Sequence, residues 1–107
     1  MLTPDTINEM VAREVPGTFA AGYICGSDFI VCYVGRSDLD LNRELKKWVF
    51  YRSDCLFFKF LITTTAQEAF LKECRCFHDF NGTSGLKNTS HPMPVKDSGW
   101  KCPVCKP

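Results

Sequence analysis

The chain ends in a Cys-x2-Cys pair, Cys102-Pro-Val-Cys105, and this pair constrains the fold more than any other feature. Two cysteines at this spacing can bind one tetrahedral metal ion, and the turn between them can donate amides to the sulfurs. The residues after Phe80 are rich in Asn, Gly, Ser and Pro and have almost no apolar periodicity, so they need a tether to adopt one structure. We therefore predict that a metal ion, zinc, pins a tail over residues 81–107.

A predicted helix over residues 65–78 offers the remaining ligands. Cys74 and His78 are four positions apart and so about 40° apart around the helix axis, which lets both reach one ion. His91 is the alternative for the fourth position, and Cys76 is another if the helix ends before it. The competing interpretation is a terminal cysteine pair that binds nothing. The predicted structural zinc site consists of Cys74, His78, Cys102 and Cys105.

Length and composition predict one small domain without a membrane segment. The chain has 107 residues, 45% of them hydrophobic, which is enough for one modest core. Its formal net charge of +1 creates no field that would by itself attract nucleic acid or anionic lipid. No stretch approaches the roughly 18 apolar residues that span a bilayer, and the first residues do not resemble a secretion signal. We expect an intracellular, cytoplasmic protein whose seven cysteines are reduced.

Local patterns predict three helices and three strands. Thr3 is the expected N-cap of a leading helix that ends before Pro16. Segments 18–24 and 29–34 are rich in aromatic and β-branched residues around a turn signal, and predict a hairpin. Asp38 is the expected N-cap of the next helix, whose apolar stripe begins at Leu39. Segment 56–62 reads as a central strand covered on both faces, and a threonine run at 63–65 then opens the helix over 65–78.

A candidate active site follows from one misplaced charge. Glu73 lies in the middle of the apolar stripe of the helix over 65–78, where a carboxylate is costly unless it is paired or binds a metal. Tyr33 and Arg36 flank Gly35, which allows a tight turn from strand to helix, and a tyrosine with an arginine can activate a nucleophile and hold a phosphate. The alternative is an ion pair of Glu73 with Arg36 or Arg43 that only fixes packing.

Four segments carry a resemblance to a known family. In order and spacing, the chain is similar to the successive motifs of the GIY-YIG nuclease superfamily, and its downstream residues resemble a branch with a zinc-binding tail. The matching segments are Pro16-Gly17-Thr18-Phe19, Tyr33-Val34-Gly35-Arg36-Ser37-Asp38, Asp40-Leu41-Asn42-Arg43-Glu44-Leu45 and the helix of Glu73, followed by His78-Asp79-Phe80, Asn88, His91-Pro92 and Trp100-Lys101-Cys102-Pro103-Val104-Cys105.

The resemblance implies an α+β fold, a small three-stranded antiparallel sheet flanked by helices, and cleavage of DNA with one magnesium or manganese ion. In that scheme Tyr33 activates water, Arg36 steadies the phosphate, Glu73 binds the catalytic metal, and Asn88 matches a motif asparagine. The chain is then a single domain over 1–107, with a GIY-YIG-like core at 16–80 and a zinc-pinned tail at 81–107 docked on the helix at 65–78.

This chain departs from the family pattern at two positions. Phe19 stands where the first motif has a tyrosine, and Tyr23, four residues along the strand and on the same face, is the candidate to replace it. Glu44 stands where the helix motif usually has arginine, and Arg43 lies one position early, about 100° around the axis. The second hypothesis is therefore a catalytically degenerate module that binds nucleic acid or a protein.

Overall fold

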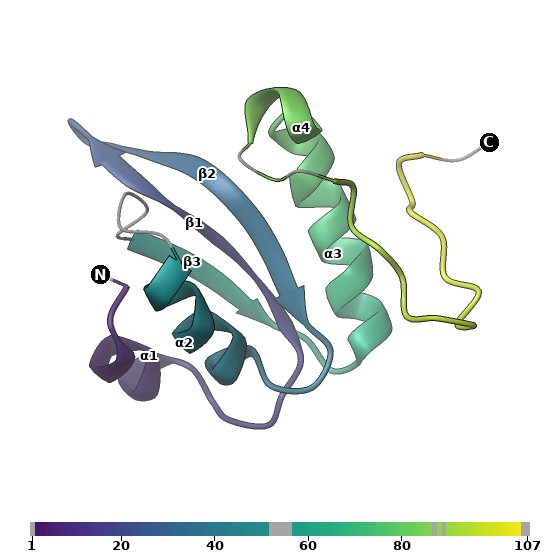
Figure 1. The fold of residues 1–107 in the computed structure, drawn as a ribbon, viewed down its shortest axis with the longest axis horizontal. Coiled ribbons are helices and arrows are strands. Elements are labelled where there is room, and N and C mark those ends of the chain that lie inside the picture. Colours follow the sequence, from purple (N-terminus) through teal and green to yellow (C-terminus); the bar gives the residue numbers. More distant parts are fainter. Residues whose placement is uncertain (1, 52–56, 87, 89, 106–107) are drawn as a thin grey trace.

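The computed structural model describes residues 2–51, 57–86, 88 and 90–105 and shows an α+β fold, as predicted. Figure 1 shows α1 and α2 on one side of the sheet and α3 on the other. The elements run in the order α1 (Pro4–Met10), β1 (Gly17–Cys25), β2 (Asp28–Ser37), α2 (Leu41–Tyr51), β3 (Phe57–Ile62), α3 (Ala66–Asp79) and α4 (Gly82–Gly85).

The first helix begins where the sequence predicts. The side chain of Thr3 accepts a hydrogen bond from the backbone N–H of Thr6, which satisfies one free amide of the first turn. Sequence reasoning did not find what holds α1 in place. Asn42, buried on α2, donates its side-chain amide to the carbonyl of Val11 at 2.9 Å, just beyond the end of α1. Buried amides rarely lack partners, so this contact fixes the packing of the two helices.

The predicted hairpin is confirmed and is longer than expected. β1 and β2 pair antiparallel from Gly17 opposite Ser37 to Cys25 opposite Asp28, with a bulge beside Gly22. A side chain at Gly22 would meet the carbonyl oxygen of Ile30 at 2.0 Å, so the close approach of the strands at the bulge requires glycine there.

The third strand is not central, contrary to the prediction. The sheet order is β2-β1-β3, so β1 is central and β3 is an edge strand. Leu61 and Ile62 are 47% and 38% exposed. The dense apolar run has one face packed on the core and a second face that is only partly covered. In a run of six residues, apolar periodicity cannot distinguish such a strand from one covered on both faces. Leu56, the first residue of the predicted strand, lies outside the described residues.

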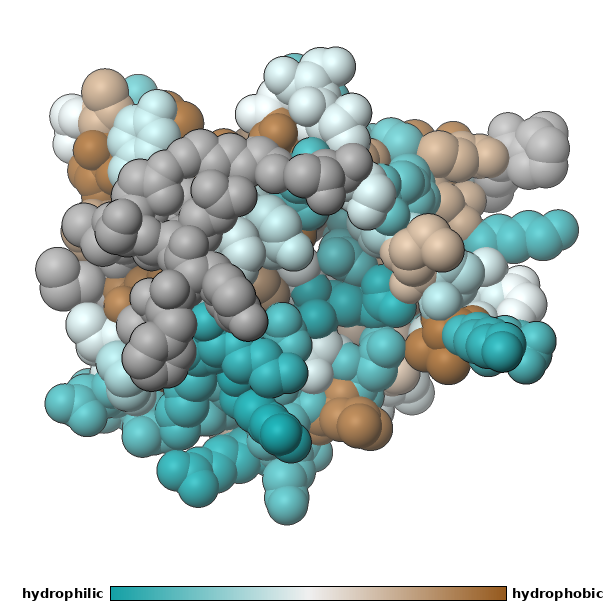
Figure 2. All heavy atoms as spheres, viewed as in Figure 1, coloured by the Kyte–Doolittle hydropathy of each residue, from teal (hydrophilic) through white to brown (hydrophobic). Residues whose placement is uncertain are grey.

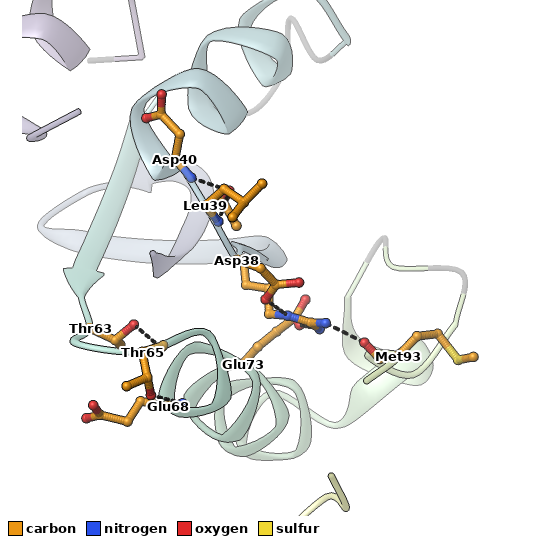
Figure 3. A network of polar contacts seen from close by, with 10 residues as sticks. Asp38, Leu39, Asp40, Thr63, Thr65, Glu68, Glu73 and Met93 are labelled. Atoms are coloured by element: carbon orange, nitrogen blue, oxygen red, sulfur yellow. Dashed lines mark hydrogen bonds and ion pairs between the residues drawn. The ribbon is translucent and has the colours of Figure 1, made fainter. Parts of the chain in front are cut away.

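The second helix begins two residues later than a cap at Asp38 would place it. Asp40 accepts a hydrogen bond from the backbone N–H of Arg43 and acts as the cap. Ser37 Oγ accepts from the backbone N–H of Asp40 at 2.9 Å and so holds the preceding turn (Figure 3). Leu39, expected on the apolar stripe, is 81% exposed because it lies in that turn.

Two clusters of buried side chains fill the two faces of the sheet. Phe19, Leu41 and Leu45 belong to the cluster beneath α1 and α2. Val34 and Phe77 belong to the other, beneath α3. Because neighbouring residues of a strand point to opposite faces, β1 and β2 contribute to both clusters.

The tail returns along α3, as Figure 1 shows for the yellow-green segment after α4. Thr65 caps α3 by accepting from the backbone N–H of Glu68 at 3.1 Å, as predicted. The ring of Trp100 in the tail packs against Phe70 of α3, with centroids 6.0 Å apart. The four-residue α4 reverses the chain after α3, and residues after it can therefore contact α3 along its length.

Candidate functional site

Four side chains near the end of the chain form a group that could hold a metal ion. His78 comes from the last turn of α3 and His91 from the tail, and the ligand atoms of all members lie within 4.8 Å of one another. The Nε2 atoms of the two histidines are 3.1 Å apart. Cys105 Sγ lies 3.0 Å from Nε2 of His78 and 3.5 Å from Nε2 of His91. The group consists of His78, His91, Cys102 and Cys105.

The geometry of this group fits a tetrahedral ion such as zinc. Zinc bonds of about 2.0 Å to nitrogen and about 2.3 Å to sulfur place tetrahedral ligands roughly 3.3 to 3.7 Å apart. The separations around Cys105 are similar or slightly shorter. His91 Nδ1 contacts the carbonyl of Pro92 at 2.7 Å, and an N–H there leaves the Nε2 lone pair directed at the group.

The group contains His91, which the sequence offered as the alternative for the fourth position, while the favoured Cys74 lies beside the group. Cys74 is fully buried, one turn before His78 on α3, and its thiol hydrogen-bonds to Cys102. Burial and this contact raise the pKa of Cys74 to about 12. Cys76, the other alternative, is also outside the group. His91 was a named alternative, but no helical geometry places it, because α4 and the tail bring it to α3.

Cys102 of the terminal pair has the chemistry expected of a metal ligand. Burial works against ionisation of Cys102. Backbone N–H groups of Cys105 and Val104 and the side chains of His91 and Cys74 outweigh burial, and lower the pKa of Cys102 to about 6. A thiolate, not a thiol, is the zinc ligand, so at neutral pH this sulfur is ready to coordinate.

The second site is centred on the predicted Glu73, which pairs with Arg36. Arg36 Nη1 donates to Glu73 Oε1 at 2.7 Å and Arg36 Nε donates to Asp38 Oδ1 at 2.9 Å. The guanidinium also donates to the carbonyl of Met93 and lies 5.0 Å from the ring centroid of Phe70. Glu73, Asp38 and Met93 thus converge on the guanidinium from α3, the turn after β2 and the tail (Figure 3).

Burial and the ion pair act in opposite directions on the pKa values of Arg36 and Glu73. The side chains of Arg36 and Glu73 are only 12% and 10% exposed. Burial raises the pKa of Glu73 above its ordinary value, and the contact with Arg36 opposes this. Burial lowers the pKa of Arg36, but its bonds to Asp38 and Glu73 outweigh that and raise it. The alternative interpretation of the sequence was an ion pair of Glu73 with Arg36 that fixes packing. The structure contains this ion pair.

Three predicted catalytic residues line one pocket. Tyr33, Glu73 and Asn88 border a cavity of about 200 Å³ together with tail residues 90–93. Tyr33 is partly buried and stacks on Trp48, with ring centroids 4.1 Å apart. The sequence could not indicate that the segment 90–93 covers this pocket, since nothing in its pattern names a partner.

Asn88 also has a structural role. Its side-chain amide donates to the carbonyl of Val34 at 2.8 Å, and its oxygen accepts from the N–H of the same residue at 3.1 Å. The asparagine thereby pairs with the free edge of β2 as a neighbouring strand would. This double contact is buried and fixes the start of the tail beside the pocket.

Other predicted residues lie away from the pocket or differ in role. Tyr23 is 44% exposed near the tip of the hairpin, about 13 Å along β1 from Phe19 at the usual strand rise, so it does not replace the missing hydroxyl there. Arg43 is exposed in the first turn of α2. Gly35 lies within β2, not in a turn, and an added Cβ would meet the Phe19 ring at 2.6 Å.

Comparisons of the chain with protein-family models, curated proteins and solved structures found no match. The likeness to the GIY-YIG superfamily therefore stays a prediction from motifs. Among the described residues, no helix has the length and apolar character needed to cross a bilayer.

Proposed function

We propose that this chain is a metal-dependent endonuclease that hydrolyses phosphodiester bonds of DNA. The observation that carries the proposal is the convergence of Tyr33, Glu73 and Asn88 on one pocket, with Arg36 bound to Glu73. These residues come from β2, α3 and the tail. The order of the family motifs in the sequence predicted that they belong to one site. A tyrosine, a carboxylate and an arginine suffice for phosphodiester hydrolysis when one divalent ion is present.

Each residue has a distinct task in this proposal. Magnesium or manganese would supply Lewis-acid stabilisation of the phosphate charge. Glu73 would hold that ion, Tyr33 would orient the attacking water, and Arg36 would contact a phosphate oxygen. The water oxygen bonds to phosphorus while one P–O ester bond breaks, and a proton goes to the leaving oxygen. The products are a phosphomonoester and a free hydroxyl.

In the described conformation, the pocket around Glu73 is not open to a metal ion or to DNA. Arg36 contacts Glu73, Asp38 and the carbonyl of Met93, so each of its three guanidinium nitrogens makes a hydrogen bond. Glu73 must exchange Arg36 for the ion, and residues 90–93 must move for DNA to reach the pocket. Three basic side chains on α2, Arg43, Lys46 and Lys47, are available for phosphate contacts.

We further propose that zinc is the ion of the His78 group and that its role is structural. Four protein ligands close a tetrahedral site and leave no position for substrate. Such a site ties the C-terminal end of α3, through His78, to the tail, through His91 and the cysteine pair. Metal analysis of the purified chain should give one zinc, and a zinc-free preparation with an unchanged melting temperature would contradict the structural role.

The nuclease proposal is tested by nicking of supercoiled plasmid with magnesium or manganese. Glu73→Gln should abolish nicking, whereas Glu68→Gln, an exposed carboxylate on the same helix, should not. Circular dichroism of both variants checks that they fold. Absence of nicking with either ion by the unmodified chain would refute the proposal.

A second function, non-catalytic binding of nucleic acid or protein, is favoured by one specific observation. Phe19 occupies the first-motif position with a ring that is 4% exposed and packed against Tyr33, so this position supplies no hydroxyl. A gel shift with a short duplex, unaffected by Glu73→Gln and without any cleavage, would support this function instead.

A further inference from the structure

A second cavity of about 330 Å³ lies on the other side of α3 and shares no lining residue with the pocket around Glu73. Its floor is formed by β1 and β3 and one wall by α3. Figure 1 shows α3 running beside the sheet. The volume falls within the range of small-molecule sites.

Small side chains in the central strand create this hollow. Thr18 and Ala20 of β1 lie in the floor, where larger residues would fill the space between the sheet and α3. Leu61 of β3 and Phe80, at the end of α3, line the cavity while remaining 47% and 41% exposed. The lining is therefore mostly apolar and accessible. The large apolar side chains of Leu61 and Phe80 are partly exposed to solvent.

The charged groups that line the cavity are both cationic. Lys59 comes from β3 and Lys72 from α3, so they lie on different walls. Lys59 Nζ is 5.1 Å from the ring centroid of Phe29, another lining residue, and this cation–π contact keeps the ammonium close to the apolar lining. No Asp or Glu is among the described residues that line the cavity.

We propose that this cavity binds a small amphiphilic carboxylate, with an aliphatic body against the Ala20 floor and the carboxylate between Lys59 and Lys72. The apolar lining gains from covering the ligand body, because apolar surface is removed from water on both partners. The two ammonium groups select an anion over a neutral molecule of the same shape. The site goes beyond the proposed nuclease function and does not depend on it.

The test uses decanoate, with decanol as the uncharged molecule of equal chain length. Each is titrated below its aggregation threshold into the full-length, zinc-loaded, 15N-labelled chain, and amide shifts are followed by NMR. Decanoate should shift the amides of Thr18, Ala20, Leu61 and Cys76, and decanol should bind at least several-fold more weakly. Shifts elsewhere, or none at these positions, would overturn the site.

Two lysine variants test the ligand class without disturbing the core. Because ion pairs at exposed sites contribute up to about 1 kcal/mol, Lys59→Gln and Lys72→Gln should each weaken decanoate binding up to about five-fold, with no effect on decanol. Lys47→Gln, an exposed lysine on α2 across the sheet, should leave both affinities unchanged. Equal affinities for decanoate and decanol in all variants would refute recognition of an anion and leave only an apolar cavity.

Discussion

Removing Arg36 should make the cost of burying Glu73 measurable. In the substitution Arg36→Met the length and apolar stem of the side chain are kept, and its three hydrogen bonds are lost. Asp38 is 31% exposed at its side chain and can be solvated instead. Glu73, 10% exposed, cannot, so it carries most of the loss.

The size of the effect has an upper limit set by protonation. An unpaired buried carboxylate can avoid the desolvation penalty of its charge by taking up a proton. For a group of ordinary pKa 4.5, the free energy of protonation at pH 7 is about 3.4 kcal/mol. Breaking a buried pair by removing one partner costs about 3–5 kcal/mol in general. We therefore expect Arg36→Met to lower the free energy of unfolding by about 3 kcal/mol at pH 7.

The loss should shrink in acid. Without Arg36, burial and the nearby charge of Asp38 move the folded pKa of Glu73 further above the unfolded value. The folded state then binds more protons than the unfolded state, so stability from this group is present at low pH and is lost as pH rises through the folded pKa. The difference between variant and unmodified chain should fall by up to about 1.4 kcal/mol per pH unit from pH 7 toward pH 5.

Urea unfolding followed by tryptophan fluorescence measures this difference at each pH. Adding Glu73→Gln to Arg36→Met should recover much of the loss, because no charge then needs a partner. Arg43→Met, at an exposed position, should change stability by less than about 0.5 kcal/mol. A loss below about 1 kcal/mol at pH 7, or one that does not depend on pH, would refute the reasoning.

Three further predictions follow from single contacts. Asn88→Ala removes both hydrogen bonds to the edge of β2 and should cost about 2 kcal/mol in urea unfolding, while Asn88→Asp, which sets a buried carboxylate oxygen against the carbonyl of Val34, should cost at least as much at pH 7. His91→Ala should lose bound zinc by mass-spectrometric metal analysis, whereas Cys74→Ala should retain one equivalent; the opposite result would restore the ligand set predicted from the sequence. Gly35→Ala places a methyl group 2.6 Å from an aromatic ring carbon and should lower stability by about 1–3 kcal/mol, seen as a reduced melting temperature.

Local sequence determined the elements that depend on neighbouring residues. Thr3 and Thr65 cap their helices as predicted, because a side-chain oxygen and the amide three residues later are enough to define a helix start. The charge of Glu73 on an apolar stripe also predicted a partnered carboxylate, since a 3.6-residue period places it in the core whatever the surrounding fold.

Tertiary structure alone decided which distant residues meet. His91 enters the metal-binding group because α4 turns the tail back along α3, and no spacing rule predicts that return. The apolar run of β3 could not show that its strand lies at the edge, because sheet order depends on long-range pairing. The sequence thus specified which groups need partners, and the packing of the chain specified which partners they have, because those contacts join residues far apart in the chain.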